Sequence, residues 1–234
     1  MPRQEMSKSA VTRERVFQTA LRLFVESGYA ATTMRQIALE APCAVGLIYR
    51  YFPSKEDLAI ELYARLAARF RRDLAFVPEG DLAGRFGSAM RLKLELLAPY
   101  REPLTALAAA ALDPNSKANV FSTSNRGARA EVIEGFAVVI EEATDAPGRA
   151  REEKIAPLLY AAHLLLVLFW LQDASSCQRK TDDAIAAAER LISYVMPFAM
   201  TPFFDMALES LGDVVGGTFV SHAMRSETAQ EQDR

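Results

Sequence analysis

Apolar residues recur at helical spacing along most of this chain, and no segment alternates apolar and polar residues as a strand does. The spacing predicts a first helix capped by Thr12 and a long helix over residues 55–73. Further helices follow, separated by turns rich in proline, aspartate and glycine. With 234 residues, 50% of them hydrophobic, the chain can bury a substantial core. The pattern therefore predicts an all-α protein.

Two short amphipathic helices, joined by a tight turn, are expected within residues 31–58. Thr33 and Gln36 fit a capping box at the start of the first. In the second, Ile48 and Phe52 stand four apart and form an inner face. This arrangement is typical of a helix-turn-helix, in which one helix braces another that lies in the DNA major groove. A plain helical hairpin inside an all-α core is the alternative.

Charge is distributed unevenly along the chain. Residues 1–72 carry 12 basic and 7 acidic side chains, whereas the other 162 residues carry 15 basic and 23 acidic ones. A basic N-terminal part suits DNA binding, because neutralised phosphates supply most of the sequence-independent affinity. Random surface charge would explain the excess by itself, but not its coincidence with the helix-turn-helix pattern.

Residues 12–62 resemble the N-terminal DNA-binding domain of the TetR family of transcriptional repressors. The pattern G-x-[IL]-Y-x-[HY]-F, followed after a short break by K-x-x-L, carries the resemblance. The matching residues are Gly28, Tyr29, Thr33, Ile37, Ala38, Gly46, Ile48, Tyr49, Tyr51, Phe52 and 54–58. The resemblance implies a three-helix helix-turn-helix domain joined to a larger helical domain for ligand binding and dimerisation.

The same resemblance implies contacts with DNA phosphates. Thr33 and Tyr49 would donate their hydroxyls, and Lys55 would add a further contact. Such contacts set the register of the protein on the duplex but do not read its sequence.

Other positions would face base edges or the nearby backbone. They are Arg35, Ala44, Val45, Gly46, Leu47, Arg50 and Tyr51. Gly46 lacks a Cβ atom, which permits close approach of the helix to DNA. We interpret Val45 and Leu47 as contacts for thymine methyl groups. Arg35 and Arg50 would then read bases such as guanine by hydrogen bonds.

Three positions depart from the family pattern. Pro42 stands where glycine usually ends the bracing helix, and proline cannot adopt a positive φ. Ala44 replaces the usual serine cap of the second helix, at a cost of about 1 kcal/mol. A hydrophobic staple between Cys43 and Ile48 would compensate in part. Leu47 is apolar where many relatives are polar.

Two late helices, over residues 151–174 and 181–199, suggest an association surface. Residues 156–171 are apolar except for His163, a run too short for a membrane span, which needs about 20 residues. A helix apolar nearly all round must be covered on every side. The resemblance implies a homodimer interface made by these two helices of each subunit. Such a dimer would bring two recognition helices to the two half-sites of a palindromic operator. Two ordinary core helices are the alternative.

The resemblance also implies that a small-molecule effector binds in the C-terminal bundle and reorients the DNA-binding domains. Candidate lining residues are Met90, Leu94, Phe121, Tyr160, His163, Phe169 and Trp170, each an equally good core residue. We see no basic cluster in this region, which disfavours a bulky anionic effector. An apolar or amphipathic compound is expected.

Nothing in the sequence indicates catalysis, a metal site or a cofactor. The two histidines are far apart, and no glycine-rich phosphate loop is present. With only two cysteines, Cys43 and Cys177, and no signal peptide, we expect a reduced, cytoplasmic protein.

The pattern divides the chain into four parts: a flexible arm over residues 1–11, a DNA-binding domain over 12–56, a ligand-binding and dimerisation domain over 57–216, and a flexible tail over 217–234. We expect a ligand-responsive repressor that binds a palindromic operator as a dimer. The alternative is a helical small-molecule-binding or scaffold protein that has lost specific DNA reading. Steep loss of operator binding with salt would separate the two.

Overall fold

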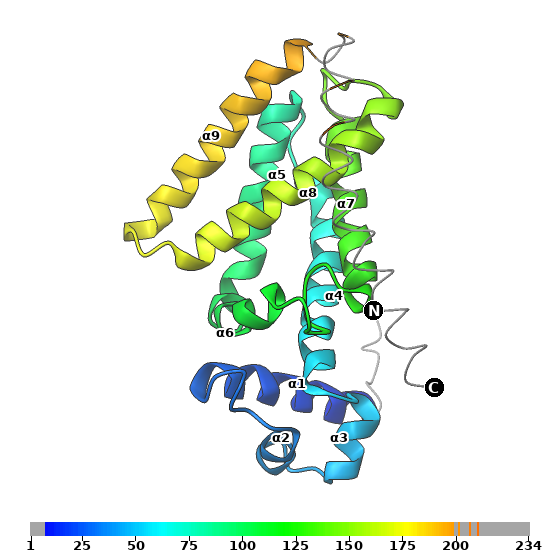
Figure 1. Ribbon diagram of the computed structural model, residues 1–234, viewed down its shortest axis with the longest axis vertical. Helices are drawn as coiled ribbons and strands as arrows, with labels where there is room; N and C mark the ends of the chain where they lie inside the picture. The colour runs from blue at the N-terminus through cyan, green and yellow to red at the C-terminus, as the bar shows by residue number, and fades with distance from the viewer. Residues whose placement is uncertain (1–7, 199–200, 202–205, 207–209, 211–234) are drawn as a thin grey trace, which may run out of the picture. The chain divides into compact units, whose positions relative to one another are not determined.

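The computed structural model describes residues 8–198 together with 201, 206 and 210, and this part of the chain is helical and contains no strand (Figure 1). The expected all-α class is confirmed. The chain forms two compact units. The head unit contains residues up to Tyr63 and the segment Tyr100–Val120, and the body unit contains Ala64–Pro99 and the residues from Phe121 onward.

The head unit is built around α1, which packs against the neighbouring helices (Figure 1). Its helices are α1 (Lys8–Glu26), α2 (Met34–Glu40), α3 (Val45–Tyr51), the start of α4 (Lys55–Asp73) and α6 (Arg101–Leu112). Phe17, Ile48 and Phe52 are buried in its core, and the rings of Phe17 and Phe52 stack with centroids 6.4 Å apart. We expected residues 57–216 to form one domain, and the presence of α6 in the head unit is a difference that helical periodicity does not reveal.

The expected helix boundaries of the head follow from local hydrogen bonds. The Thr33 hydroxyl accepts from the Gln36 amide at 3.2 Å, and Gln36 Oε1 accepts from the Thr33 amide at 2.8 Å, which confirms the capping box. Ser54 Oγ accepts from the Asp57 amide at 3.3 Å at the start of α4. Gly28 has φ +80° just after α1 ends, a conformation that glycine readily adopts after the last turn of a helix.

The expected cap of the first helix is wrong. The helix begins at Lys8, and the Thr12 hydroxyl donates to the Lys8 carbonyl at 2.9 Å inside the helix. Residues 8–11, expected in a flexible arm, are therefore helical, because a threonine can satisfy its hydroxyl on the preceding turn without ending the helix. The rest of the arm, and the tail expected from residue 217, lie outside the described residues.

Lys55 holds the turn between α1 and α2. Its ammonium donates to the carbonyl oxygens of Tyr29 at 2.6 Å, Ala30 at 3.2 Å and Thr32 at 3.1 Å. It also lies 4.4 Å from the centroid of the Tyr29 ring. An ammonium has three N–H donors, and these three carbonyl oxygens provide one acceptor for each of them within the head unit.

The body unit is a layered helical bundle. Its helices are the rest of α4, then α5 (Leu82–Leu97), α7 (Arg126–Glu141), α8 (Arg149–Gln172) and α9 (Arg179–Val195). Short 3₁₀ helices accompany them at Leu74–Phe76, Thr123–Asn125, Ser176–Gln178 and Met196–Phe198, and a further one, Ala98–Tyr100, ends at the first residue of the head segment Tyr100–Val120. Figure 1 shows α5 beside α9 and α7 beside α8, and these pairs are in contact. Both late helices begin two residues before their expected starts, α8 also ends two residues early, and α9 ends at Val195, before the expected end at 199.

Charged side chains link the helices of the body unit. Arg85, only 3% exposed, donates to the Val139 carbonyl at 3.0 Å and forms an ion pair with Glu142, which joins α5 to α7. Gly87 leaves space for the Glu189 side chain of α9, which accepts from Arg91 of α5 at 2.8 Å. A Cβ atom on Gly87 would overlap the Glu189 carboxylate.

By length and composition, α8 is the one helix in the described part of the chain that could cross a membrane. Core helices of soluble proteins meet the same criterion. One side of α8 is buried in the bundle, including Tyr160, His163 and Trp170, whereas Leu165 and Phe169 are exposed.

The connection between α8 and α9 is tied by polar contacts. Trp170 Nε1 donates to Gln178 Oε1 at 2.7 Å, and the Asp173 carboxylate accepts from the Ser175 amide at 2.9 Å and the Thr181 hydroxyl at 2.7 Å. Hydrogen bonds from Ser175 and Thr181 hold the pKa of Asp173 well below its ordinary value. Within this connection Cys177 and Gln178 have positive φ values, 52° and 55°.

We expect Cys177→Gly to stabilise the protein by about 1 kcal/mol, because glycine adopts a positive φ without the steric cost of a Cβ atom. Denaturant unfolding followed by the helical circular dichroism signal measures the change. Ser176→Gly is the matched control, since it adds the same backbone freedom where φ is not positive and should destabilise slightly. A loss of stability in Cys177→Gly would contradict the prediction.

We expect Lys55→Met to lower the free energy of unfolding by about 1–2 kcal/mol, because three charge-assisted hydrogen bonds to turn carbonyls are lost. The same denaturation experiment applies. Arg35→Met removes one positive charge from an exposed side chain and should change the free energy of unfolding by no more than about 0.5 kcal/mol. If both variants lost the same free energy of unfolding, the effect would come from the change in net charge and not from the hydrogen bonds to the turn.

Candidate nucleic-acid interface

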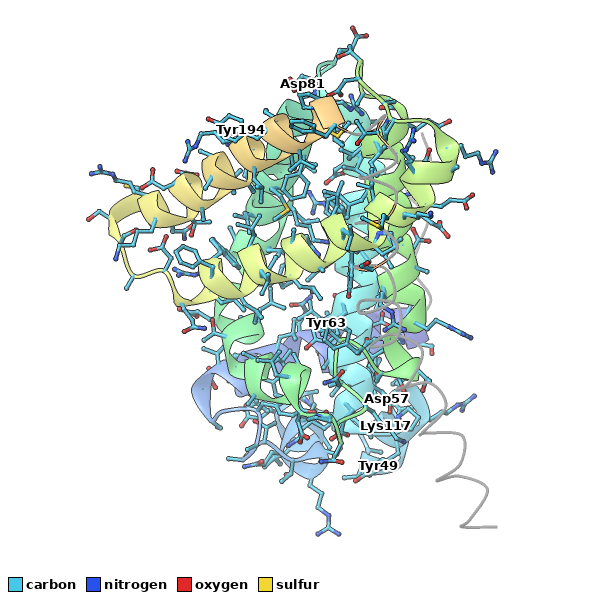
Figure 2. The ribbon with its side chains drawn as sticks, turned by 45° about the horizontal axis from the view of Figure 1, so that its top comes forward. Tyr49, Asp57, Tyr63, Asp81, Lys117 and Tyr194 are labelled. Carbon is cyan, nitrogen blue, oxygen red and sulfur yellow. The ribbon has the colours of Figure 1, made fainter. Side chains whose placement is uncertain are left out.

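The third helix presents an open face to solvent. Val45 and Tyr49 are 42% and 48% exposed, and Gly46 and Arg50 are exposed beside them, whereas Ile48 is fully buried. Figure 2 labels Tyr49 on this helix. A helix anchored on one side and bare on the other is the geometry that insertion into a DNA groove requires.

Two further predicted base contacts on α3 are half-buried. They are Leu47 and Tyr51, and the Tyr51 hydroxyl lies 3.0 Å from Ser9 Oγ of α1. Ala44 is exposed at the N-cap and provides no side-chain hydrogen bond, as expected for alanine.

The bracing helix adds two exposed candidates near its N-terminus. Thr33 has its hydroxyl on Gln36, and Arg35 is exposed. Within the described part of the chain, neither Arg35 nor Arg50 makes a hydrogen bond or an ion pair. Both guanidinium groups are therefore available to an external acceptor.

The structure gives Lys55 an internal role that the sequence did not indicate. Its ammonium is directed to the turn carbonyls described above, so a phosphate contact would require it to give up at least one of them. Direct phosphate binding by Lys55 stays a prediction.

Arg13 is a positioning residue that sequence reasoning missed. Its guanidinium forms two hydrogen bonds with Glu61, at 2.9 and 2.8 Å, and lies 4.7 Å from the centroid of the Phe52 ring. The contacts join α1 and α4 to the end of α3. Residues 39 and 48 positions away in sequence meet here, so no local pattern could have found them.

The predicted ligand contacts all belong to the body unit, but they do not form one group. Met90, Leu94, Tyr160, His163 and Trp170 are buried, and the rings of Tyr160 and His163 lie 5.4 Å apart. By contrast, Phe121 is half-buried and Phe169 is exposed. Phe169 therefore does not line the interior.

The body unit contains a buried cation that sequence reasoning missed. Lys93 is 4% exposed, and its ammonium lies 4.2 Å from the centroid of the Phe70 ring. Burial lowers the pKa of Lys93 to about 7. The sequence does indicate this position, because Lys93 stands three residues after Met90 and seven after Phe86. That spacing places Lys93 on the apolar stripe of α5.

His163 lies in the same part of the bundle as a neutral group. Burial, with a smaller effect of the Lys93 charge, lowers the pKa of His163 to about 3. One ring nitrogen, Nδ1, lies 3.1 Å from the Tyr160 carbonyl oxygen. Among the residues whose placement is described, no three or more His, Cys, Asp or Glu side chains gather where they could hold a metal ion.

Two family profiles match this chain. One, described as bacterial regulatory proteins of the tetR family, matches residues 16–62. The other, described as the C-terminal domain of tetracyclin repressor-like proteins, matches residues 85–216.

Curated relatives match the N-terminal region. The transcriptional repressor KstR of Rhodococcus jostii (strain RHA1) is 45% identical over 53 residues, which are 23% of this chain and 25% of KstR. The transcriptional regulator HbdR of Aromatoleum sp. (strain CIB) is 44% identical over 62 residues, 23% of this chain and 27% of HbdR. The chain thus matches about a quarter of the length of these relatives.

Solved structures share the fold over most of the chain. A TetR-family regulator from Syntrophomonas wolfei superposes with a TM-score of 0.64 at 20% identity, covering 79% of this chain and 95% of that one. Thermus thermophilus FadR, a TetR-family repressor in complex with lauroyl-CoA, superposes with a TM-score of 0.54 at 22% identity, covering 80% and 94%. At these identities the likeness shows the fold alone.

The C-terminal profile spans more than half of the sequence, and the named relatives are transcriptional regulators, not enzymes. The chain therefore belongs to the TetR family of transcriptional regulators.

Proposed function

We propose that this protein is a ligand-responsive repressor that binds a palindromic operator as a homodimer. The single observation that carries the proposal is the open face of α3, with the exposed cations Arg35 and Arg50 in the same unit. Family membership and the repressor KstR among the relatives support this reading. Occlusion of a promoter needs no further contact with the transcription machinery.

On the operator, α3 would lie in the major groove and α2 would brace it. Tyr49 and Thr33 would donate hydroxyls to phosphates, which sets the register. Arg50 and Arg35 would read bases, because a guanidinium can make two hydrogen bonds to guanine. Val45 would contact a thymine methyl group.

The proposed dimer surface consists of exposed apolar residues on α8, on α9 and on the 3₁₀ helix Met196–Phe198 that follows α9. Leu191 and Tyr194 are 64% and 71% exposed, and Figure 2 labels Tyr194 on α9. The full set is Leu165, Phe169, Leu191, Tyr194, Val195 and Phe198. Exposed apolar side chains at helical spacing on two contacting helices mark an association site, since monomers seldom leave such patches open. A twofold interface would then bring two heads to one palindrome.

The effector would be a small apolar or amphipathic molecule bound in the body unit. The buried residues Met90, Tyr160 and His163 supply an apolar environment with polar tips. FadR of Thermus thermophilus, similar in fold, holds lauroyl-CoA, an amphipathic acyl compound.

A second candidate is a helical ligand-binding or scaffold protein that no longer reads DNA. It is favoured by Ala44, which leaves the start of α3 without a side-chain cap. Binding assays on genomic fragments at increasing salt separate the two, because operator binding falls steeply with salt and strongly exceeds binding to random duplex.

We expect Arg50→Ala to weaken operator binding about tenfold to a hundredfold, because a bidentate base contact discriminates by about 1–3 kcal/mol. Binding to random duplex should fall much less. Fluorescence anisotropy on operator and random DNA measures both. Tyr49→Phe is the comparison, since loss of a phosphate contact should weaken the two alike and Tyr49 is exposed. If Arg50→Ala lowered both affinities equally, Arg50 would be a phosphate contact.

We expect Leu191→Asp to shift the protein from dimer to monomer, because a carboxylate would be buried at the centre of the proposed apolar interface. Sedimentation velocity gives the mass, and circular dichroism checks that the helices persist. Leu112→Asp, also an exposed leucine but in the head unit, should remain dimeric. A monomeric wild-type protein would refute the dimer itself.

A further inference from the structure

The buried ammonium of Lys93 has no acidic partner. Among the described residues it makes no hydrogen bond and no ion pair. In the same part of the chain, Asp173 is the one fully buried carboxylate, and Ser175 and Thr181 supply its hydrogen bonds. A buried cation without a counter-ion is costly, because burial removes its hydration and no carboxylate compensates its charge.

A series of neighbouring aromatic rings begins at this cation and continues into the bundle. The aromatic cluster consists of Phe70, Phe86, Phe136, Tyr160 and His163, contributed by α4, α5, α7 and α8. Successive centroids are 5.4 to 5.8 Å apart. The ring of Phe70 faces the ammonium directly. A cation–π contact offsets part of the lost hydration but provides no hydrogen-bond acceptor.

The titratable groups of this region are Lys93, His163 and Tyr160, with Arg129 of α7 near Tyr160. Burial keeps His163 and Tyr160 neutral at pH 7, with pKa values of about 3 and about 12. Arg129 donates to the Ser122 carbonyl at 3.2 Å. Lys93 is therefore the cation of this region that lacks a hydrogen-bond acceptor among the described residues. A ligand with one negative charge would supply that acceptor. A phosphate ester carries about two charges near neutral pH and would need more donors.

We propose that the effector is an amphipathic carboxylic acid whose carboxylate accepts hydrogen bonds from Lys93 and whose apolar part lies against the aromatic cluster. This inference rests on the proposed function, since it identifies the chemical class of the effector in the body unit. It also explains the missing counter-ion, which the ligand supplies. A charge-assisted hydrogen bond away from water is strong and directional, so Lys93 would select acids over neutral analogues.

Direct binding to the full-length protein without DNA tests the proposal. Isothermal titration calorimetry would compare hexanoate, decanoate and tetradecanoate with the primary amide of each chain length, and with decyl phosphate. We expect at least one acid to bind about tenfold to a hundredfold more tightly than its amide. In Lys93→Met this preference should disappear while affinity for the amide remains.

Controls separate a ligand contact from a structural role. Lys93→Met replaces a buried cation by an apolar chain of similar length, so its ligand-free melting temperature should rise by several degrees. Lys180→Met removes an exposed charge on α9 and should keep the preference for acids. Near pH 8, acid binding should also take up protons, seen as a dependence of the enthalpy on the buffer, because a bound anion raises the pKa of Lys93.

Three results would overturn the proposal: no acid binds, acid and amide bind equally, or Lys93→Met keeps the preference. Tighter binding of decyl phosphate than of decanoate would also reject it, in favour of a phosphate ligand. Failure of the proposed repressor function looks different. In that case the acids bind with the expected preference, but no genomic fragment is bound by the ligand-free protein.

Discussion

The packing of Phe52 against Phe17 and against the guanidinium of Arg13 is the contact on which the orientation of the exposed face of α3 depends. The third helix has seven residues, far too few to be stable alone in water. Its orientation is therefore set by its buried side. Ile48 and Phe52 anchor that side, and the Arg13–Glu61 ion pair ties the same point to α4. The side chains on the exposed side of α3 are not needed to hold the helix in place.

Much of this fold could be predicted from sequence because its determinants are local. The Thr33–Gln36 capping box, the positive φ at Gly28 and the Ser54–Asp57 contact at the start of α4 are each encoded within four residues. The exposed face of α3 follows from two buried residues four positions apart. Local hydrogen bonds and helical periodicity are the information that a single sequence carries most reliably.

Features that depend on distant contacts could not be predicted. Nothing near Tyr100 indicates that α6 joins the head unit, because its partners lie in α1. Lys55 looked like a surface cation, yet its ammonium lies on carbonyls 23 to 26 residues earlier. The expected cap at Thr12 was wrong, because threonine occurs both at the N-cap of a helix and inside a helix with its hydroxyl bonded to the preceding turn. Lys93 differed: its place on an apolar stripe was visible, but lysine is seldom fully buried.

The missing side chain at Gly87 has a mechanical consequence. The Glu189 carboxylate of α9 occupies the space that Gly87 leaves on α5 and forms an ion pair with Arg91 of the same helix. This contact fixes the register between α5 and α9. Sliding one helix along the other would separate this ion pair and move the Glu189 side chain out of the space beside Gly87. This contact therefore couples the position of α9 to that of α5, the helix that also carries Lys93.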